Sequence, residues 1–152
     1  GRQVALEVIR HHRLLELFLH ETLGYGWDEV HVEADRLEHV ISEEMEERIA
    51  QALGQPLVDP HGQPIPTRDL TLPPHSTLRL DQLQTGQSAR VERVEDDDSD
   101  LLRYLSSVGL VPQAELTVLE RSYFDDNLSL QVGASVVVLG PRVTSQIYVE
   151  VV

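Results

Sequence analysis

Six prolines crowd the stretch from Pro56 to Pro74 and divide the chain into two parts of different character. Proline donates no backbone N–H and clashes with the preceding helical turn, so this stretch can form neither a long helix nor a central strand. We expect a Pro-rich connector over residues 57–76 between two small domains, which span residues 1–72 and 73–152.

The residues before the connector have a helical pattern. Three segments place apolar residues at the three- and four-residue spacing of an amphipathic helix, namely residues 4–23, 30–42 and 42–53. Ser42 is a suitable N-cap for the third helix, and Gly54 would end it. Because three helices with few aromatic residues make a thin core, we expect this domain to form a homodimer through its helices.

The residues after the connector have the two-residue period of strands. Five short segments show it: residues 89–94, 116–119, 128–132, 135–139 and 147–151. Residues 101–108, between the first two, read as a short helix. So many short strands in so few residues predict a small, curled β-barrel. The predicted fold class is therefore α+β, with a three-helix domain followed by the barrel.

The charge balance excludes several classes of partner. The net charge is −14, which repels the phosphates of nucleic acids and of membrane surfaces. No apolar run reaches the roughly 20 residues of a membrane span, and the absence of cysteine excludes disulfides and thiolate metal sites. These features fit a cytoplasmic protein. Gly1 enters the first helix without an initiating Met, so we expect the sequence to be part of a longer chain.

The second predicted helix carries the most distinctive polar residues. At about 100° per residue, one arc of its surface, beside the apolar stripe, would hold His31, Asp35, Glu38 and His39. Two imidazoles and two carboxylates suit a divalent transition metal. A solvated acidic face with stray histidines fits the spacing equally well.

A second pair of residues favours the metal. His12 lies within the apolar side of the first predicted helix, and Glu16 follows one turn later. A buried imidazole and carboxylate are costly unless they are paired or bind a metal. A structural His–Glu hydrogen bond is the alternative. Two helices that each carry His and carboxylate four residues apart could close one metal site or two neighbouring ones.

Three motifs in this order resemble one family. They are His-Arg-Leu-Leu-Glu at residues 12–16, the His-x3-Asp-x2-Glu-His helix at 31–39, and Pro-His-Gly-Gln-Pro-Ile-Pro at 60–66. This combination resembles the diphtheria toxin repressor family of iron- or manganese-dependent bacterial transcriptional regulators. Such proteins have a winged-helix DNA-binding domain, a helical dimerisation and metal domain, and often an SH3-like barrel similar to FeoA. The resemblance implies that operator DNA is bound by an upstream domain and not by these residues.

The resemblance also implies the metal ligands. The ancillary site would comprise His12, Glu16 and His31, and the primary, activating site would comprise Asp35, Glu38 and His39. The barrel would add Glu95 and Asp98 from the acidic run, whereas four other histidines would be surface or connector residues: His11, His20, His61 and His75. The primary site also takes a ligand from the upstream domain, so we expect it to be incomplete here.

The residue at position 35 bears on which metal ion the site would bind. Iron-type members of the family usually carry Cys there and manganese-type members usually carry Glu, whereas this chain has Asp35. A hard carboxylate favours Mn²⁺ or Fe²⁺ over softer ions, and we favour manganese.

Two other functions compete with a metal-dependent regulator. One is a metal-independent dimeric interaction module with a peptide-binding barrel. The other is a metalloenzyme, but the chain has neither His-Glu-x-x-His nor the Glu-x-x-His pairs of di-iron bundles. We therefore do not expect an enzyme.

Overall fold

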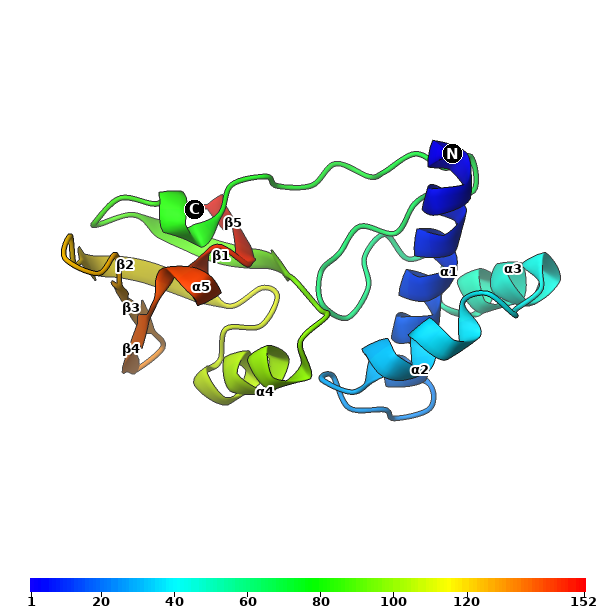
Figure 1. The fold of residues 1–152 in the computed structure, drawn as a ribbon, viewed down its shortest axis with the longest axis horizontal. Helices are drawn as coiled ribbons and strands as arrows, with labels where there is room; N and C mark the ends of the chain where they lie inside the picture. Colours follow the sequence, from blue (N-terminus) through cyan, green and yellow to red (C-terminus); the bar gives the residue numbers. More distant parts are fainter. The chain divides into compact units, whose positions relative to one another are not determined.

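The computed structural model describes all residues from Gly1 to Val152, in two compact units, Gly1–Pro74 and His75–Val152. The first unit contains three helices, α1 (Arg2–Glu21), α2 (Val30–Leu37) and α3 (Glu43–Ala52), and both α2 and α3 contact α1 (Figure 1). Its core comprises Leu14, Leu15, Leu19, Val30, Ala34, Ile49, Ala50 and Ile65. The three helices therefore share one apolar core.

The ends of the helices follow local signals in part. Ser42 caps α3 as predicted, because its Oγ accepts a hydrogen bond from the Met45 N–H at 3.1 Å. Gly54, just beyond the end of α3, has φ +75°. The second helix is shorter than predicted: it ends at Leu37, whose carbonyl oxygen accepts from both the Val40 and Ile41 N–H groups. The chain then turns, so His39 does not continue the helical arc.

Much of the Pro-rich stretch is packed into the first unit rather than extended in solvent. Residues 61–66 are all buried. Arg10 donates from Nη1 to the Pro66 carbonyl oxygen at 2.8 Å, and Arg13 donates to the Pro64 carbonyl oxygen. Prolines offer acceptors but no donors, and the arginines of α1 supply those donors. Part of the predicted connector over residues 57–76 therefore packs against α1.

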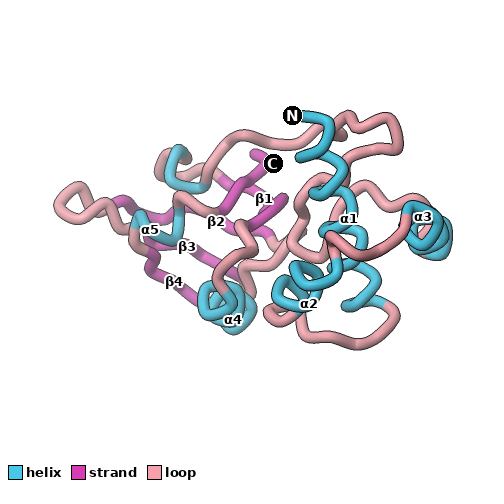
Figure 2. The backbone as a smooth tube through the Cα atoms, turned by 45° about the vertical axis from the view of Figure 1, so that its right-hand side comes forward, coloured by secondary structure: helices cyan, strands magenta, loops and turns pink.

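The second unit is built on one antiparallel sheet in the order β4-β3-β2-β1-β5, with its strands drawn in magenta in Figure 2. Its strands are β1 (Ser88–Val94), β2 (Glu115–Arg121), β3 (Leu128–Val132), β4 (Ser135–Leu139) and β5 (Ile147–Val151). A helix, α4 (Ser99–Val108), lies between β1 and β2 in the sequence, and its Leu101, Leu102 and Leu105 are buried. The five predicted strands and this helix are confirmed. Two short elements were not predicted: the 3-10 turn η1 (Leu80–Gln82) and α5 (Pro141–Thr144).

No helix of the protein combines the length and the apolar character that crossing a membrane would require.

Candidate metal centre

Three predicted ligands meet between α1 and α2. The Nε2 atom of His12 lies 3.2 Å from Glu16 Oε1 and 3.2 Å from His31 Nδ1. Glu16 is fully buried, whereas the side chain of His31 is 29 % exposed. One proton on His12 Nε2 cannot form good hydrogen bonds to both Glu16 and His31. One cation, however, can accept lone pairs from all three side chains. Two imidazoles and a carboxylate therefore fit a divalent transition metal.

The other oxygen of Glu16 faces a second group of ligand atoms. His61 Nδ1 lies 3.6 Å from Glu16 Oε2, and ligand atoms of Glu16, Asp59 and His61 all lie within 4.8 Å of one another. His61 Nε2 lies 2.7 Å from the Trp27 carbonyl oxygen, which can only accept, so Nε2 carries a proton. A neutral ring then presents its Nδ1 lone pair toward a carboxylate, an arrangement that a cation between them would stabilise.

Sequence reasoning missed Asp59 and His61. The assignment of His61 to a surface or connector role overlooked that it is completely buried, and His11 is only 8 % exposed. Asp59 Oδ1 accepts hydrogen bonds from the N–H groups of His61 and Gln63, which shapes the turn that carries the imidazole. The adjacent Asp-Pro-His residues were the available signal. Spacing alone did not show that this turn packs on α1.

The predicted primary ligands are only partly brought together. Ligand atoms of His12, Asp35 and Glu38 lie within 4.8 Å of one another, and His12 Nδ1 is 2.9 Å from Glu38 Oε2. Burial raises the pKa of Glu38, and the hydrogen bond and negative charge of Asp35 raise it further. His39 has a largely exposed side chain in the turn after α2, and its Nε2 lies 3.5 Å from Glu38 Oε1.

The two ligands predicted from the barrel lie in the second unit. Asp98 is the N-cap of α4, and its Oδ1 accepts from the N–H groups of Asp100 and Leu101 at 3.0 and 3.2 Å. The Glu95 N–H donates to the Gln146 carbonyl oxygen. Asp98 thus has a structural role of its own, and metal binding by Glu95 and Asp98 stays a prediction.

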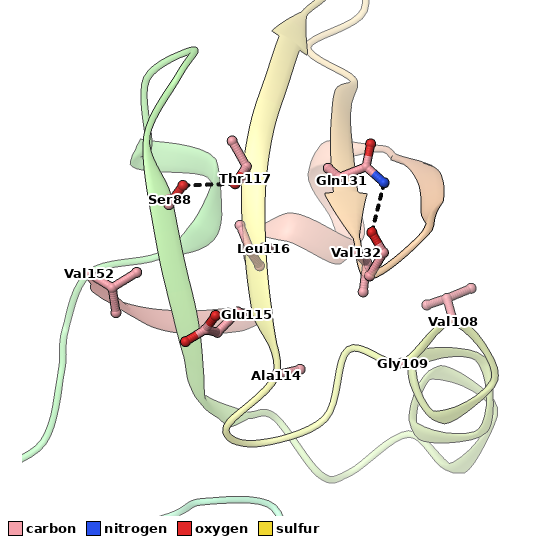
Figure 3. A pocket seen from close by; sticks show the side chains of 11 residues that line it. Ser88, Val108, Gly109, Ala114, Glu115, Leu116, Thr117, Gln131, Val132 and Val152 are labelled. Carbon is pink, nitrogen blue, oxygen red and sulfur yellow. Dashed lines mark hydrogen bonds between the residues drawn. The ribbon is translucent and has the colours of Figure 1, made fainter.

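The second unit also carries a shallow pocket at one end of β1, β2 and β3 (Figure 3). Val108, Leu116 and Val132 contribute apolar surface to it, and Ser88 Oγ and Thr117 Oγ1 lie 2.7 Å apart at its edge. No His lines this pocket, which makes it a separate feature from the metal-ligand clusters.

Comparison with known proteins matches both units. Residues 1–67 match the family described as iron dependent repressor, metal binding and dimerisation domain, and residues 78–151 match the FeoA domain. The iron-dependent repressor IdeR of Mycobacterium leprae is 40% identical over 131 residues, which are 78% of this chain and 56% of that protein. The chain thus spans little more than half the length of this curated relative.

Solved structures agree with these matches. A manganese-dependent transcriptional repressor in complex with manganese is 40% identical, with a TM-score of 0.96, over 100% of this chain and 72% of that one. The repressor ScaR with bound Cd²⁺ is 35% identical, with a TM-score of 0.90, over 100% of this chain and 71% of that one.

Proposed function

The chain belongs to the diphtheria toxin repressor family of iron- or manganese-dependent transcriptional regulators, and on this premise we propose that it is the metal-sensing and dimerising part of such a repressor. It contains the metal-binding and dimerisation domain and a FeoA domain. The alternative of a metal-independent interaction module is not favoured, because the helical unit matches a metal-binding domain along residues 1–67.

The observation that carries the proposal is the convergence of His12, Glu16 and His31. One imidazole nitrogen lies 3.2 Å from both a carboxylate oxygen and a second imidazole. Nitrogen and oxygen donors without thiolate suit Mn²⁺ and Fe²⁺, and we favour Mn²⁺ because Asp35 adds a hard carboxylate nearby. The bound ion would supply positive charge that holds α1 and α2 in one arrangement.

The buried pair Asp59 and His61 extends this site. Glu16 directs Oε1 toward His12 and Oε2 toward His61, so its carboxylate would provide an oxygen ligand to either group. We propose Asp59 and His61 as ligands in addition to His12, Glu16 and His31. Asp35, Glu38 and His39 are proposed for the primary site, which upstream residues complete. Glu95 and Asp98 are proposed as ligands from the second unit.

The proposed mechanism is allosteric and involves no catalysis. Metal binding favours one arrangement of α1, α2 and the following turn within a homodimer. Upstream DNA-binding domains would then match the spacing of two operator half-sites. A ligand shifts such an equilibrium only by its differential affinity, typically about 1–3 kcal/mol. The regulator would act in the cytoplasm on genes of metal homeostasis.

Calorimetric titration tests the proposal. The 152-residue chain is titrated with Mn²⁺, Fe²⁺ under anaerobic conditions, and Zn²⁺. We expect saturable Mn²⁺ binding that the His12→Ala/His31→Ala variant loses. The control is His75→Ala, which removes an exposed histidine of the second unit. Equal binding by the native chain and the double variant, or no binding by the native chain, would refute the proposed site.

A further inference from the structure

Two consecutive histidines of α1 hold two different parts of Glu38. His12 contacts the side chain, with Nδ1 2.9 Å from Glu38 Oε2. His11 contacts the backbone, with Nδ1 3.1 Å from the Glu38 carbonyl oxygen. Since a carbonyl oxygen can only accept, His11 Nδ1 carries a proton and donates it to this bond. Glu38 is therefore held at both its backbone and its side chain.

The carbonyl group of Glu38 occupies a position that needs a donor. Glu38 is the C-cap of α2, where the last carbonyl groups of a helix lack partners within the helix. The same carbonyl belongs to the peptide group that joins Glu38 to His39, two proposed ligands of the primary site. The hydrogen bond from His11 therefore orients the peptide group between the two residues that carry these ligand side chains.

The other edge of the His11 ring is also fixed. Its Nε2 lies 3.3 Å from Oε2 of Glu46, a residue of α3. Arg10 Nε lies 3.0 Å from the other oxygen of Glu46, and Arg10 also bonds to the Pro66 carbonyl oxygen. Arg10, His11 and Glu46 are each more than nine-tenths buried. The ring thus connects the end of α2 to α3 through interactions that are largely shielded from solvent.

We propose that His11 is a positioning residue of the metal centre. It binds no metal itself, but it holds the peptide group of Glu38 so that the carboxylate meets His12 and Asp35. The inference rests on the proposed metal-binding function. Outer partners that orient ligands typically contribute about 10–100-fold to metal affinity, and we expect a loss of that size without the His11 hydrogen bond.

The test is made in one background that lacks the Glu46 carboxylate, so that the Arg10 guanidinium is without its carboxylate partner equally in every protein compared. Glu46→Gln serves as the reference, since a neutral amide still accepts from Arg10 and leaves no unpaired carboxylate when His11 is changed. In this background His11→Phe keeps the ring but removes the donor. His11→Asn places an amide nitrogen near the position of Nδ1 and restores the donor. Mn²⁺ affinity is measured for all three by electron paramagnetic resonance of the unbound ion.

We expect the His11→Phe variant to bind Mn²⁺ about 10–100-fold more weakly than the reference, and the His11→Asn variant to recover most of that loss. Circular dichroism and thermal unfolding without metal identify any variant that fails to fold. Folded Phe and Asn variants that both bind as the reference does, or that are equally weakened, would overturn the inference while leaving metal binding itself intact. No saturable binding by the native chain would overturn the proposed function and this inference together.

A readout that needs no metal accompanies the titration. Imidazole ¹⁵N spectra of the native chain report whether His11 Nδ1 carries the proton. We expect a protonated Nδ1 in the metal-free protein, and a spectrum with the proton only on Nε2 would overturn the inference by itself. The His11→Asn variant, in which the His11 resonances are absent, provides the assignment.

Discussion

His12 Nδ1 lies 2.9 Å from Glu38 Oε2, while Nε2 of the same ring faces Glu16 and His31. One imidazole therefore touches residues of both proposed metal sites, which the family resemblance treats as separate. When a metal occupies Nε2, the proton of a neutral ring must be on Nδ1, where Glu38 accepts it. His12 thus connects the residues of the two proposed sites directly.

Substitution of Glu16 is expected to weaken metal binding more than substitution of any other single ligand, because its two oxygens face His12 and His61. Glu16→Gln should weaken Mn²⁺ binding by at least about 100-fold, more than the effect typical of an outer partner. Calorimetry against the native chain measures the change. Glu44→Gln, at an exposed position of α3, is the matched control and should bind normally. A Glu16→Gln variant that binds as tightly as this control would exclude Glu16 as a ligand.

Glu46 should make the stability of the protein depend on pH. Burial raises its pKa above the usual 4.5, His11 and Arg10 lower it in part, and Glu43 and Glu7 raise it further. A carboxyl group with a higher pKa in the folded state takes up protons on folding. Its stabilising contribution is therefore complete below the unfolded pKa and is lost as pH rises through the folded one.

The Glu46→Gln variant isolates this contribution. Urea unfolding of the metal-free native chain and variant, from about pH 4 to about pH 7, gives the difference between their free energies of unfolding. We expect the native chain to lose stability relative to the variant as the pH rises. A constant difference would show that the pKa of Glu46 is the same in the folded and unfolded states.

Asp98 should stabilise α4 through its capping hydrogen bonds to Asp100 and Leu101. Asp98→Ala should lower the free energy of unfolding by about 1 kcal/mol, whereas Asp98→Ser, which retains a capping oxygen, should lose less. Urea unfolding measures both. The serine variant also tests the ligand prediction, because it keeps the cap without the carboxylate. Unchanged Mn²⁺ affinity in Asp98→Ser would remove Asp98 from the set of proposed ligands.

The apolar groove between α1 and α3 is the expected dimer contact. Phe18, Met45, Ile49 and Ala52 line it, and the side chain of Met45 is about half exposed. Met45→Glu would place a charge in an apolar interface and should weaken dimerisation by at least about tenfold, which is about 1.4 kcal/mol. Sedimentation velocity measures the association. Leu57→Glu, an exposed apolar position outside the groove, is the control, and equal weakening by both variants would contradict this location.

Local sequence determined much of the fold. Helical spacing placed His12 one turn from Glu16, and the Ser42 hydroxyl fixed the start of α3. The two-residue period located the five strands, because alternation between two faces of a sheet is a property of each strand alone. These features depend on residues at most a few positions apart, which is why they can be read without the tertiary structure.

Only the tertiary structure determined which of the candidate ligand residues come together. Local periodicity gave no means of predicting that residues 59–66 fold back onto α1 and bring His61 to Glu16, since this contact joins positions 45 residues apart. The tertiary structure also gives His11 and His12 different roles. Both rings contact Glu38, but His11 contacts its backbone carbonyl and His12 contacts its carboxylate. Spacing along a helix gives the direction of a side chain, whereas its partner depends on which distant segment packs against that face.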